Sequence, residues 1–187
     1  VTLEEIRTIN QLDQDAVIMT DLIVDDDAKD ISQTVALTIE NFGPDSILNP
    51  LVWQADPRRY TITPSRMPLA IAPEEKKECA FDVRIADGSD IFPIPRFTMA
   101  YPFTYGKVCT LYNLLSVKRH KYVEAAASPP AIDGKLDDPL WHGLTPITCF
   151  ANYDGSSQAI TEKTEIYFAH DKDNLYFAAR CFESDLS

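Results

Sequence analysis

The sequence predicts an all-β protein in which an antiparallel β-sandwich is followed by a partial β-sandwich. Roughly seven short segments in the first part of the chain are apolar or alternate between polar and apolar residues, with turn-forming residues between them. Thirteen prolines against six glycines disfavour long helices and suit short strands joined by stiff turns. Hydrophobic residues make up 45% of the 187 residues, which is enough to build a packed core.

The strands of the first part can be placed in order from these patterns. Residues 3–12 carry apolar side chains at three-residue intervals and fit either a short helix or an irregular lead-in. The odd-numbered residues of the segment 79–85 share one apolar face, as in a half-buried strand. The predicted strands are residues 16–24, 34–40, 51–53, 79–85 and 108–119, the last of them long or bent.

Turn and loop residues separate these strands. Asp25–Asp27 forms an acidic turn, and Asn41–Asp45 is a turn cluster because Asn and Gly tolerate a positive φ while Pro fixes φ. In the segment 91–97, Pro93 and Pro95 lack a backbone N–H, so we expect a loop there and no central strand.

The charge balance and the hydropathy exclude several kinds of partner. The chain has 17 basic and 29 acidic side chains, a formal net charge of −12. Nucleic acid and anionic membrane surfaces are therefore not expected partners, because both need clustered Lys and Arg. No apolar run approaches the roughly 20 residues of a membrane-spanning helix, so we expect no membrane insertion. The first five residues are acidic and polar, so no signal peptide is expected in this chain.

The four cysteines leave two interpretations open. Cys79, Cys109, Cys149 and Cys181 are widely spaced, and none of the three histidines has a metal-like spacing to them, which excludes a zinc finger and a thioredoxin-type site. They can be small buried hydrophobic residues. Alternatively, one disulfide in each part of the chain, Cys79–Cys109 and Cys149–Cys181, would suit an exported protein.

The first part resembles the immunoglobulin-like accessory domains of bacterial secreted enzymes. The resemblance rests on residues 35–43, which end in an Asn-Phe-Gly turn, then on residues 69–74, and then on residues 81–85. It implies an immunoglobulin-like β-sandwich in which the apolar residues 69–72 form a strand and Pro73 and Glu74 belong to the turn that follows. Glu74 stands where such domains often carry Gly, so the turn departs from the pattern.

A composition shift marks the boundary between the two parts. Residues 122–130 lose the alternation and gain small residues and paired prolines, as expected of a short, semi-stiff linker. We therefore predict an immunoglobulin-like sandwich over residues 1–122, a linker over 123–130, and a partial β domain over 131–187.

The run from Ala131 to Trp141 has readable local physics. Asp133 and Gly134 suit a tight turn, Asp138 suits a helix N-cap, and Pro139 suits the first helical position. One helical turn would swing Leu140 and Trp141 inward as a hydrophobic plug. Further on, residues 145–150 read as a short strand, and 164–170 with 175–182 read as a hairpin around a polar turn.

This second part resembles the family 9 carbohydrate-binding modules and their relatives. Such modules open with an Ile-Asp-Gly-x-Leu-Asp-Asp-x-x-Trp run, found here at Ile132–Trp141, and continue with a hairpin that matches Thr164 to Tyr176. The resemblance implies a glycan-binding β-sandwich, often attached to glycoside hydrolases and sometimes carrying structural calcium. The modules continue with further strands, and three strands do not close a sandwich. Either this sequence is a fragment, or residues 131–187 pack against the first domain or a second chain.

The candidate carbohydrate-binding residues are Tyr153 and Trp141. Tyr153 lies in a polar loop, where its ring could stack on a sugar. Trp141 could also be a sugar platform, but its place beside Leu140 favours core packing. Core packing is also the favoured interpretation for Trp53, because its neighbours in the sequence are apolar.

Calcium is the only cofactor that the resemblance implies, and no cofactor is required by the residues themselves. Its candidate ligands by family analogy are Asp133, Asp137 and Asp138, although capping and turn formation explain these residues without metal. The carboxylates of Asp25–Asp27 lack the spacing of a calcium loop, and a solvated turn is the favoured interpretation.

Together these patterns predict a non-catalytic accessory region that binds or positions carbohydrate for a larger secreted glycan-active enzyme. Its partners would be a polysaccharide or oligosaccharide and the other domains of that enzyme, at an extracellular, periplasmic or cell-surface location. The alternative is a structural or protein-interaction β module without glycan binding. None of the acidic residues lies in a recognisable catalytic motif, which disfavours a glycoside hydrolase.

Overall fold

The computed structural model describes residues 16–104, 106–148, 150 and 162–184. The chain is all-β, with one short helix in the described residues. The strands of the first unit are β1 (Val17–Met19), β2 (Leu22–Asp25), β3 (Lys29–Glu40), β4 (Leu51–Gln54), β5 (Tyr60–Thr63), β6 (Arg66–Met67), β7 (Lys76–Asp87), β8 (Arg96–Thr104), β9 (Lys107–Leu114) and β10 (Val117–His120). The second unit contains β11 (Glu124–Ala125), α2 (Pro139–Gly143), β12 (Thr164–His170) and β13 (Leu175–Cys181).

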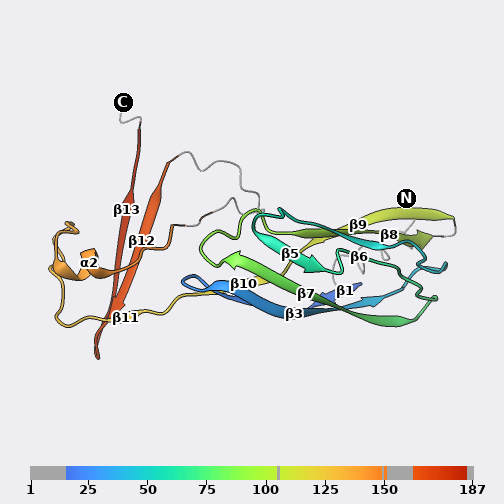
Figure 1. The fold of residues 1–187 in the computed structure, drawn as a ribbon, viewed down its shortest axis with the longest axis horizontal. Helices are drawn as coiled ribbons and strands as arrows, with labels where there is room; N and C mark the ends of the chain where they lie inside the picture. Colours follow the sequence, from blue (N-terminus) through green and yellow to red (C-terminus); the bar gives the residue numbers. More distant parts are fainter. Residues whose placement is uncertain (1–15, 105, 149, 151–161, 185–187) are drawn as a thin grey trace.

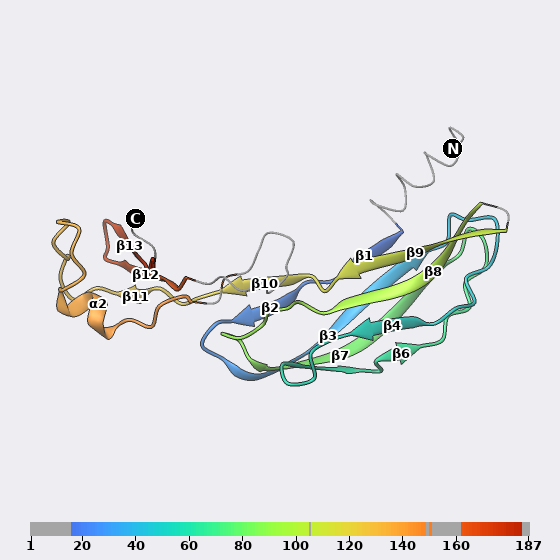
Figure 2. The same ribbon diagram turned by 90° about the horizontal axis from the view of Figure 1, so that it is seen from above.

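The first unit is an immunoglobulin-like sandwich of two antiparallel sheets. One sheet has the order β1-β3-β7-β5 and the other has the order β6-β4-β8-β9. Without β2 and β6, this order corresponds to the arrangement of immunoglobulin strands, A-B-E-D on one sheet and C-F-G on the other. Figure 1 and Figure 2 show the two layers lying over one another along the length of the unit.

The alternation of the long strands builds the core of this unit. In β7, Cys79, Phe81, Val83 and Ile85 are buried while the residues between them are exposed, as the sequence predicts. The indole of Trp53 in β4 meets the rings of Phe81 and Phe97 edge to face, with centroids 5.6 and 5.3 Å away. Trp53 is 6% exposed and belongs to the core, so the packing interpretation is confirmed.

The segment 16–24 was expected to form one strand, and that expectation is wrong. β1 pairs antiparallel with β3, whereas β2 leaves that sheet and pairs parallel with β10. The predicted closing strand over 108–119 bends in the same way, because β9 pairs with β8 before the chain turns at Leu115 and Ser116 to form β10. A hydrophobic run does not reveal a change of partner, because the same apolar residues fit a strand beside either partner.

The loop expected over 91–97 ends earlier than predicted. β8 starts at Arg96 and lies between β4 and β9, so the sheet has a central strand that the prolines seemed to forbid. Pro93 and Pro95 precede the strand. Pro102 lies within β8, beyond the residues that pair with β4, so its missing N–H costs little.

The region 57–75 contains two short strands that the sequence patterns do not reveal. Its prolines flank β5 and β6, two short strands that sequence reasoning did not separate. Residues 69–72 form no strand, and Ile71 makes only an isolated bridge to Ile47. The resemblance to accessory domains implied a strand there.

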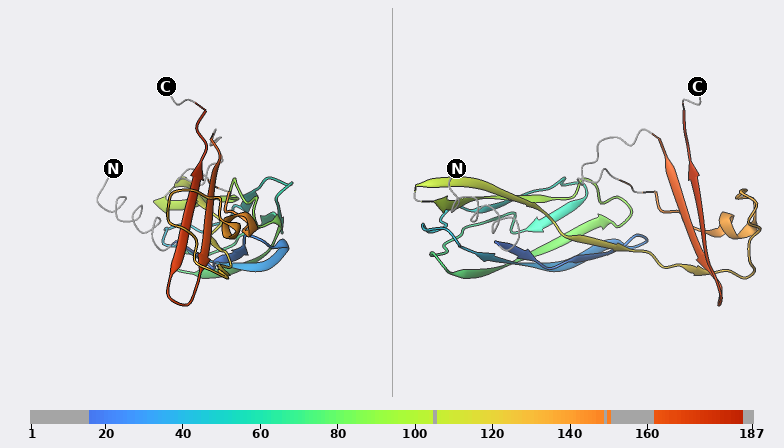
Figure 3. Two further views of the ribbon diagram at one scale, coloured as in Figure 1. Left: turned by 90° about the vertical axis from the view of Figure 1, so that its left-hand side faces the viewer. Right: turned by 180° about the vertical axis from the view of Figure 1, so that it is seen from behind.

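The second unit has its own small sheet and its own apolar cluster. The order is β11-β12-β13, with β12 and β13 forming the predicted antiparallel hairpin. Residues 145–150 contribute a single bridge between Ile147 and Ile166 in place of the expected strand. The expected linker includes β11, which pairs parallel with β12. Figure 1 and Figure 3 show this unit beyond one end of the sandwich, with α2 on the side of the hairpin that faces away from it.

Candidate functional site

The Ile132–Trp141 run folds as its residue types predict, with one exception. Gly134 has a φ of +81°, and the Asp133 carboxylate accepts a hydrogen bond from the Lys135 N–H at 2.9 Å, which closes the tight turn. α2 begins after Asp138 with Pro139 in its first turn. Asp138 makes no side-chain capping hydrogen bond to the helix, so it holds the N-cap position without capping chemistry.

Trp141 fills the centre of the second unit. It is 6% exposed, and its ring meets that of Tyr167 in β12 edge to face, with centroids 6.4 Å apart. Leu136, Leu140 and Leu144 pack around the same cluster. The plug predicted from the sequence is therefore present. Its role as a sugar platform stays a prediction.

Hydrogen bonds within the hairpin turn explain why it contains these residue types. Asp171 accepts hydrogen bonds from the backbone N–H groups of Asp173 and Asn174, at 2.8 and 2.7 Å, and from the Tyr176 hydroxyl at 2.5 Å. The Tyr176 hydroxyl, together with these backbone donors, lowers the pKa of Asp171 to about 2. Asp171, Asn174 and Tyr176 thus form a turn-forming network that needs no ligand.

A buried carboxylate lies on the α2 side of the hairpin. Glu165 is 8% exposed and is bound by Lys163 at 2.5 Å and by the Tyr167 hydroxyl at 2.9 Å. Arg180 lies 3.8 Å away across the ladder. The Lys163 hydrogen bond, followed by the Tyr167 hydrogen bond, lowers the pKa of Glu165. This group therefore stays ionised and cannot act as a general acid near neutral pH.

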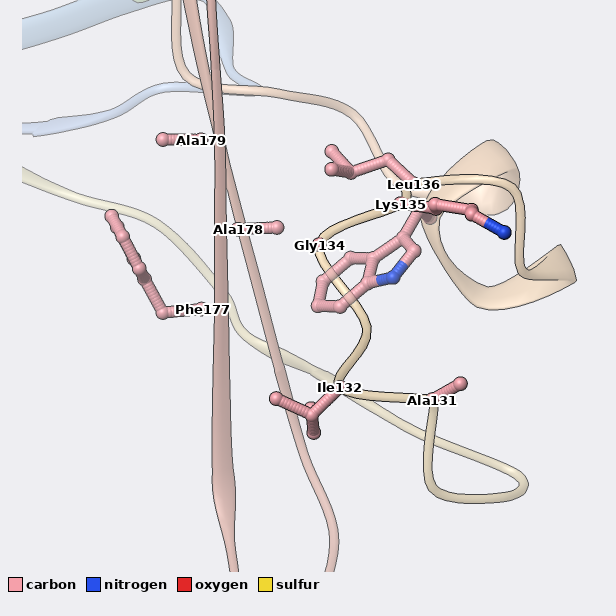
Figure 4. A pocket seen from close by; sticks show the side chains of 9 residues that line it. Ala131, Ile132, Gly134, Lys135, Leu136, Phe177, Ala178 and Ala179 are labelled. Atoms are coloured by element: carbon pink, nitrogen blue, oxygen red, sulfur yellow. The ribbon is translucent and has the colours of Figure 1, made fainter.

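The opposite face of the hairpin exposes large apolar side chains among the described residues. Phe177 is 60% exposed and Leu175 is 67% exposed, and the Phe177 ring lies 5.4 Å from that of Phe168. Figure 4 shows Phe177 and Ala179 pointing away from the α2 side, while Ala178 points toward Leu136. Sequence reasoning missed this face. The available signal was that consecutive residues 175–179 are all apolar or aromatic, which makes both faces of the strand apolar.

A shallow pocket lies along the outer side of β13. Its lining comes from the middle of the strand, from the run before α2 and from the indole (Figure 4). The lining residues are Ala131, Ile132, Gly134, Lys135, Leu136, Trp141, Phe177, Ala178 and Ala179. A second pocket on the other side of Trp141 is lined in part by His142, Tyr167 and Arg180.

The predicted calcium ligands are not gathered into a site. Asp133 closes its own turn, and Asp138 Oδ1 lies 3.5 Å from the Ala131 N–H. In the part of the chain that the structure describes, which includes Asp137, no three His, Cys, Asp or Glu side chains are placed to hold a metal ion. Tyr153, the other predicted carbohydrate-binding residue, lies outside the described residues.

The acidic turn of the first unit is not the solvated turn that was expected. Asp26 is 6% exposed and forms two hydrogen bonds with Arg119, both at 2.7 Å. Its neighbours also face the basic end of β10, Asp27 bonding Lys121 at 2.6 Å and Asp25 lying 3.7 Å from His120. We call these six side chains the ionic clasp. It joins the start of the sandwich to the strand that leads into the second unit.

Neither interpretation holds for all the described cysteines, because Cys79 is buried, Cys109 is partly buried and Cys181 is exposed. Cys79, Cys109 and Cys181 are free thiols, so the Cys79–Cys109 disulfide is not formed. Burial raises the pKa of the Cys79 and Cys109 thiols, which keeps them protonated and unreactive. Cys149 lies outside the described residues.

Comparisons with known proteins give matches among solved structures only. No protein family model and no curated protein matches the chain. Among solved structures, the chain is similar to the periplasmic chaperone SfaE, with 15% identity and a TM-score of 0.35 over 61% of each chain. It is also similar to the E. coli chaperone DraB, with 10% identity and a TM-score of 0.30 over 89% of this chain and 83% of that one. The chain thus spans 61% of the length of SfaE.

Within the described residues, no helix is long and apolar enough to cross a membrane.

Proposed function

We propose that this chain is a non-catalytic accessory region whose immunoglobulin-like sandwich positions a carbohydrate-binding unit for a larger secreted glycan-active enzyme. The observation that carries the proposal is the packing of the Ile132–Trp141 run onto the hairpin. Two motif pieces that lie far apart in the sequence form one unit around Trp141 and Tyr167. That is the relation between them that a family 9 carbohydrate-binding module would require.

The electrostatics support a non-catalytic role. Glycoside hydrolysis needs a carboxyl group with a raised pKa beside a second, ionised one. Among the described residues, every carboxyl group with a resolved pKa shift is shifted downward, in each case because of hydrogen bonds with neighbouring donors: Asp21, Asp56, Asp87, Glu165 and Asp171. These acids hold turns and ion pairs together, which is what a scaffold needs.

Recognition would use aromatic side chains that stack on the C–H faces of sugar rings, with hydrogen bonds to the hydroxyl groups. Tyr153 is the candidate platform. Tethering an enzyme to its polysaccharide in this way raises the local substrate concentration without any new catalytic contact.

Affinity electrophoresis of the full chain through gels that contain soluble polysaccharides tests the proposal. We expect retardation in at least one polysaccharide, and we expect Tyr153→Ala to reduce it. Tyr112→Ala is the matched control, because Tyr112 is 69% exposed but belongs to the sandwich. Unretarded migration across a broad panel of plant, bacterial and algal polysaccharides would contradict glycan binding.

A protein-interaction module is the second candidate, and the exposed apolar face of the hairpin favours it. Side chains such as Leu175 and Phe177 are rarely left in water together unless another surface covers them. The same electrophoresis separates the two candidates, because a protein-interaction module would show no retardation with any glycan.

A further inference from the structure

The open edge of β13 has a definite hydrogen-bonding pattern. β12 is paired on both sides, whereas β13 pairs only with β12 among the described strands. The backbone bonds from Phe182 to Lys163 and from Asp171 to Asn174 fix which residues of the ladder face one another through hydrogen bonds. Because these pairs alternate along an antiparallel ladder, the even-numbered residues of β13 bond to β12. The N–H and C=O groups of Leu175, Phe177, Ala179 and Cys181 therefore point outward.

The surface beside this edge is apolar. The pocket next to β13 is centred on Phe177–Ala179 and is bordered by Ile132, which is 84% exposed. A strand that bonds to the outward groups would run along this pocket. Water would leave both the backbone groups and the apolar lining, and a row of unpaired groups beside apolar surface is the usual template for strand addition.

The sequence of β13 is complementary to itself when two copies pair antiparallel about Ala178. If two copies pair antiparallel about Ala178, Phe177 faces Ala179 and Leu175 faces Cys181, so that a large side chain meets a smaller one each time. The outward-bonding residues also face one another in this register, as a ladder requires. The two Ala178 residues meet at the centre, where their small size leaves room beside the pocket.

The charges of β13 allow this register. The strand contains no acidic residue, and its single cation, Arg180, faces Tyr176 of the other copy and so meets no second cation. A register about Arg180 would instead place two arginines opposite each other, which is unfavourable. Each copy carries a net charge of −12, and Asp173 and Glu183 flank the strand, so the two copies repel one another and the pairing should strengthen as the ionic strength rises.

We propose that β13 is an interface for a second copy of this chain, which pairs with it antiparallel about a twofold axis at Ala178. The result is one continuous six-stranded sheet, β11-β12-β13 from each copy. Such a twofold contact is closed, because it uses the same edge of both copies. The remaining edge is β11, which has only two residues and so resists further growth. The interface does not depend on glycan binding.

Sedimentation equilibrium of the full chain over a wide concentration range tests the interface. We expect a reversible monomer–dimer equilibrium. Ala179→Pro is the diagnostic variant, because it removes an N–H that points outward and leaves the bonds to β12 intact. We expect this variant to weaken dimerisation at least about tenfold with an unchanged circular dichroism spectrum, whereas Leu48→Lys, at an exposed site of the sandwich, should dimerise normally.

Cysteine cross-linking tests the register. In a background of Cys149→Ser and Cys181→Ser, Ala178→Cys would place two thiols opposite each other at a pair without backbone hydrogen bonds, where the Cα atoms are about 4.5 Å apart. We expect a disulfide-linked dimer on oxidation. Lys172→Cys, in the exposed hairpin turn, is the control and should not cross-link. A chain that stays monomeric at all concentrations, a dimer that Ala179→Pro leaves unchanged, or cross-linking at position 172 but not at 178 would each overturn the proposal.

Discussion

The two units of this chain are built from the same kind of strand and differ in whether a second layer covers them. In the first unit, the inward faces of β3 and β7 lie against β4 and β8, and the rings of Trp53, Phe81 and Phe97 interlock across the gap. In the second unit, one face of the hairpin packs on α2 and Trp141 while the other leaves Phe177 exposed. Alternation alone therefore does not make a sandwich. Alternation gives a strand one apolar face, and that face stabilises the fold only when a second layer packs on it.

The largest expected effect is in the closed unit. Phe81→Ala opens a cavity between the two sheets, and we expect it to lower the free energy of unfolding of the sandwich by about 3–5 kcal/mol. Urea denaturation followed by tryptophan fluorescence measures this loss, with Leu48→Ala at an exposed position as the control. Because the two apolar clusters are separate, hydrogen exchange of β12 and β13 should stay unchanged. Loss of protection in the hairpin would show that the units are coupled.

A smaller effect is expected at the ionic clasp. Asp26→Ala leaves the Arg119 guanidinium without its buried carboxylate, and we expect a loss of about 1.5–3 kcal/mol. Asp27→Ala is the matched control, because Asp27 is half exposed and its pair with Lys121 should contribute less than about 1 kcal/mol. Equal effects of the two substitutions in thermal denaturation would remove the distinction between the buried and the exposed pairs.

The sandwich should also respond to alkaline pH through Tyr101. Its hydroxyl donates to the Glu40 carbonyl and accepts from the Phe42 N–H, both at 2.7 Å, and burial raises the pKa of Tyr101 to about 12. Above pH 10 the unfolded chain ionises this hydroxyl while the folded chain keeps its proton, so stability falls as the pH rises toward 12. Tyr101→Phe should lose about 1–3 kcal/mol at neutral pH and show a shallower alkaline decline in urea denaturation.

The smallest expected effect is in the hairpin at acid pH. Tyr176 and backbone donors lower the pKa of Asp171 to about 2, so the unfolded chain takes up the proton first as the pH falls. The stability that the ionised Asp171 contributes to the hairpin is complete above the ordinary pKa of 3.8 and is lost as the pH falls toward 2. Asp171→Ala should speed hydrogen exchange in β12 and β13 at pH 6 and remove part of their acid sensitivity. Unchanged exchange would mean that the turn network does not hold the hairpin.

Local patterns predicted those parts of the fold that depend on local physics. The alternation of β7, the hairpin of β12 and β13, the turn at Gly134 and the inward Trp141 follow from side-chain period and turn chemistry. The strand β8 was missed because Pro93 and Pro95 precede it and do not interrupt it, and the sequence does not show where the strand begins. The split of residues 16–24 was missed because partner choice is a long-range property.

The candidate site was predicted less completely for the same reason. The motif residues Asp133, Asp138 and Asp171 were readable as turn and cap positions, and the structure finds them there. The buried pair of Asp26 with Arg119 joins residues 93 positions apart, so three consecutive acids looked like a solvated turn.

The parallel pairing of β2 with β10 has a mechanical consequence. Tension applied between the start of the chain and the second unit would pull β2 and β10 in opposite directions along their length. All the bonds of that short ladder, and the ion pairs at its end, would then carry the load at once and would not open one after another. The joint between the two units would therefore resist stretching more strongly than strands that separate one bond at a time.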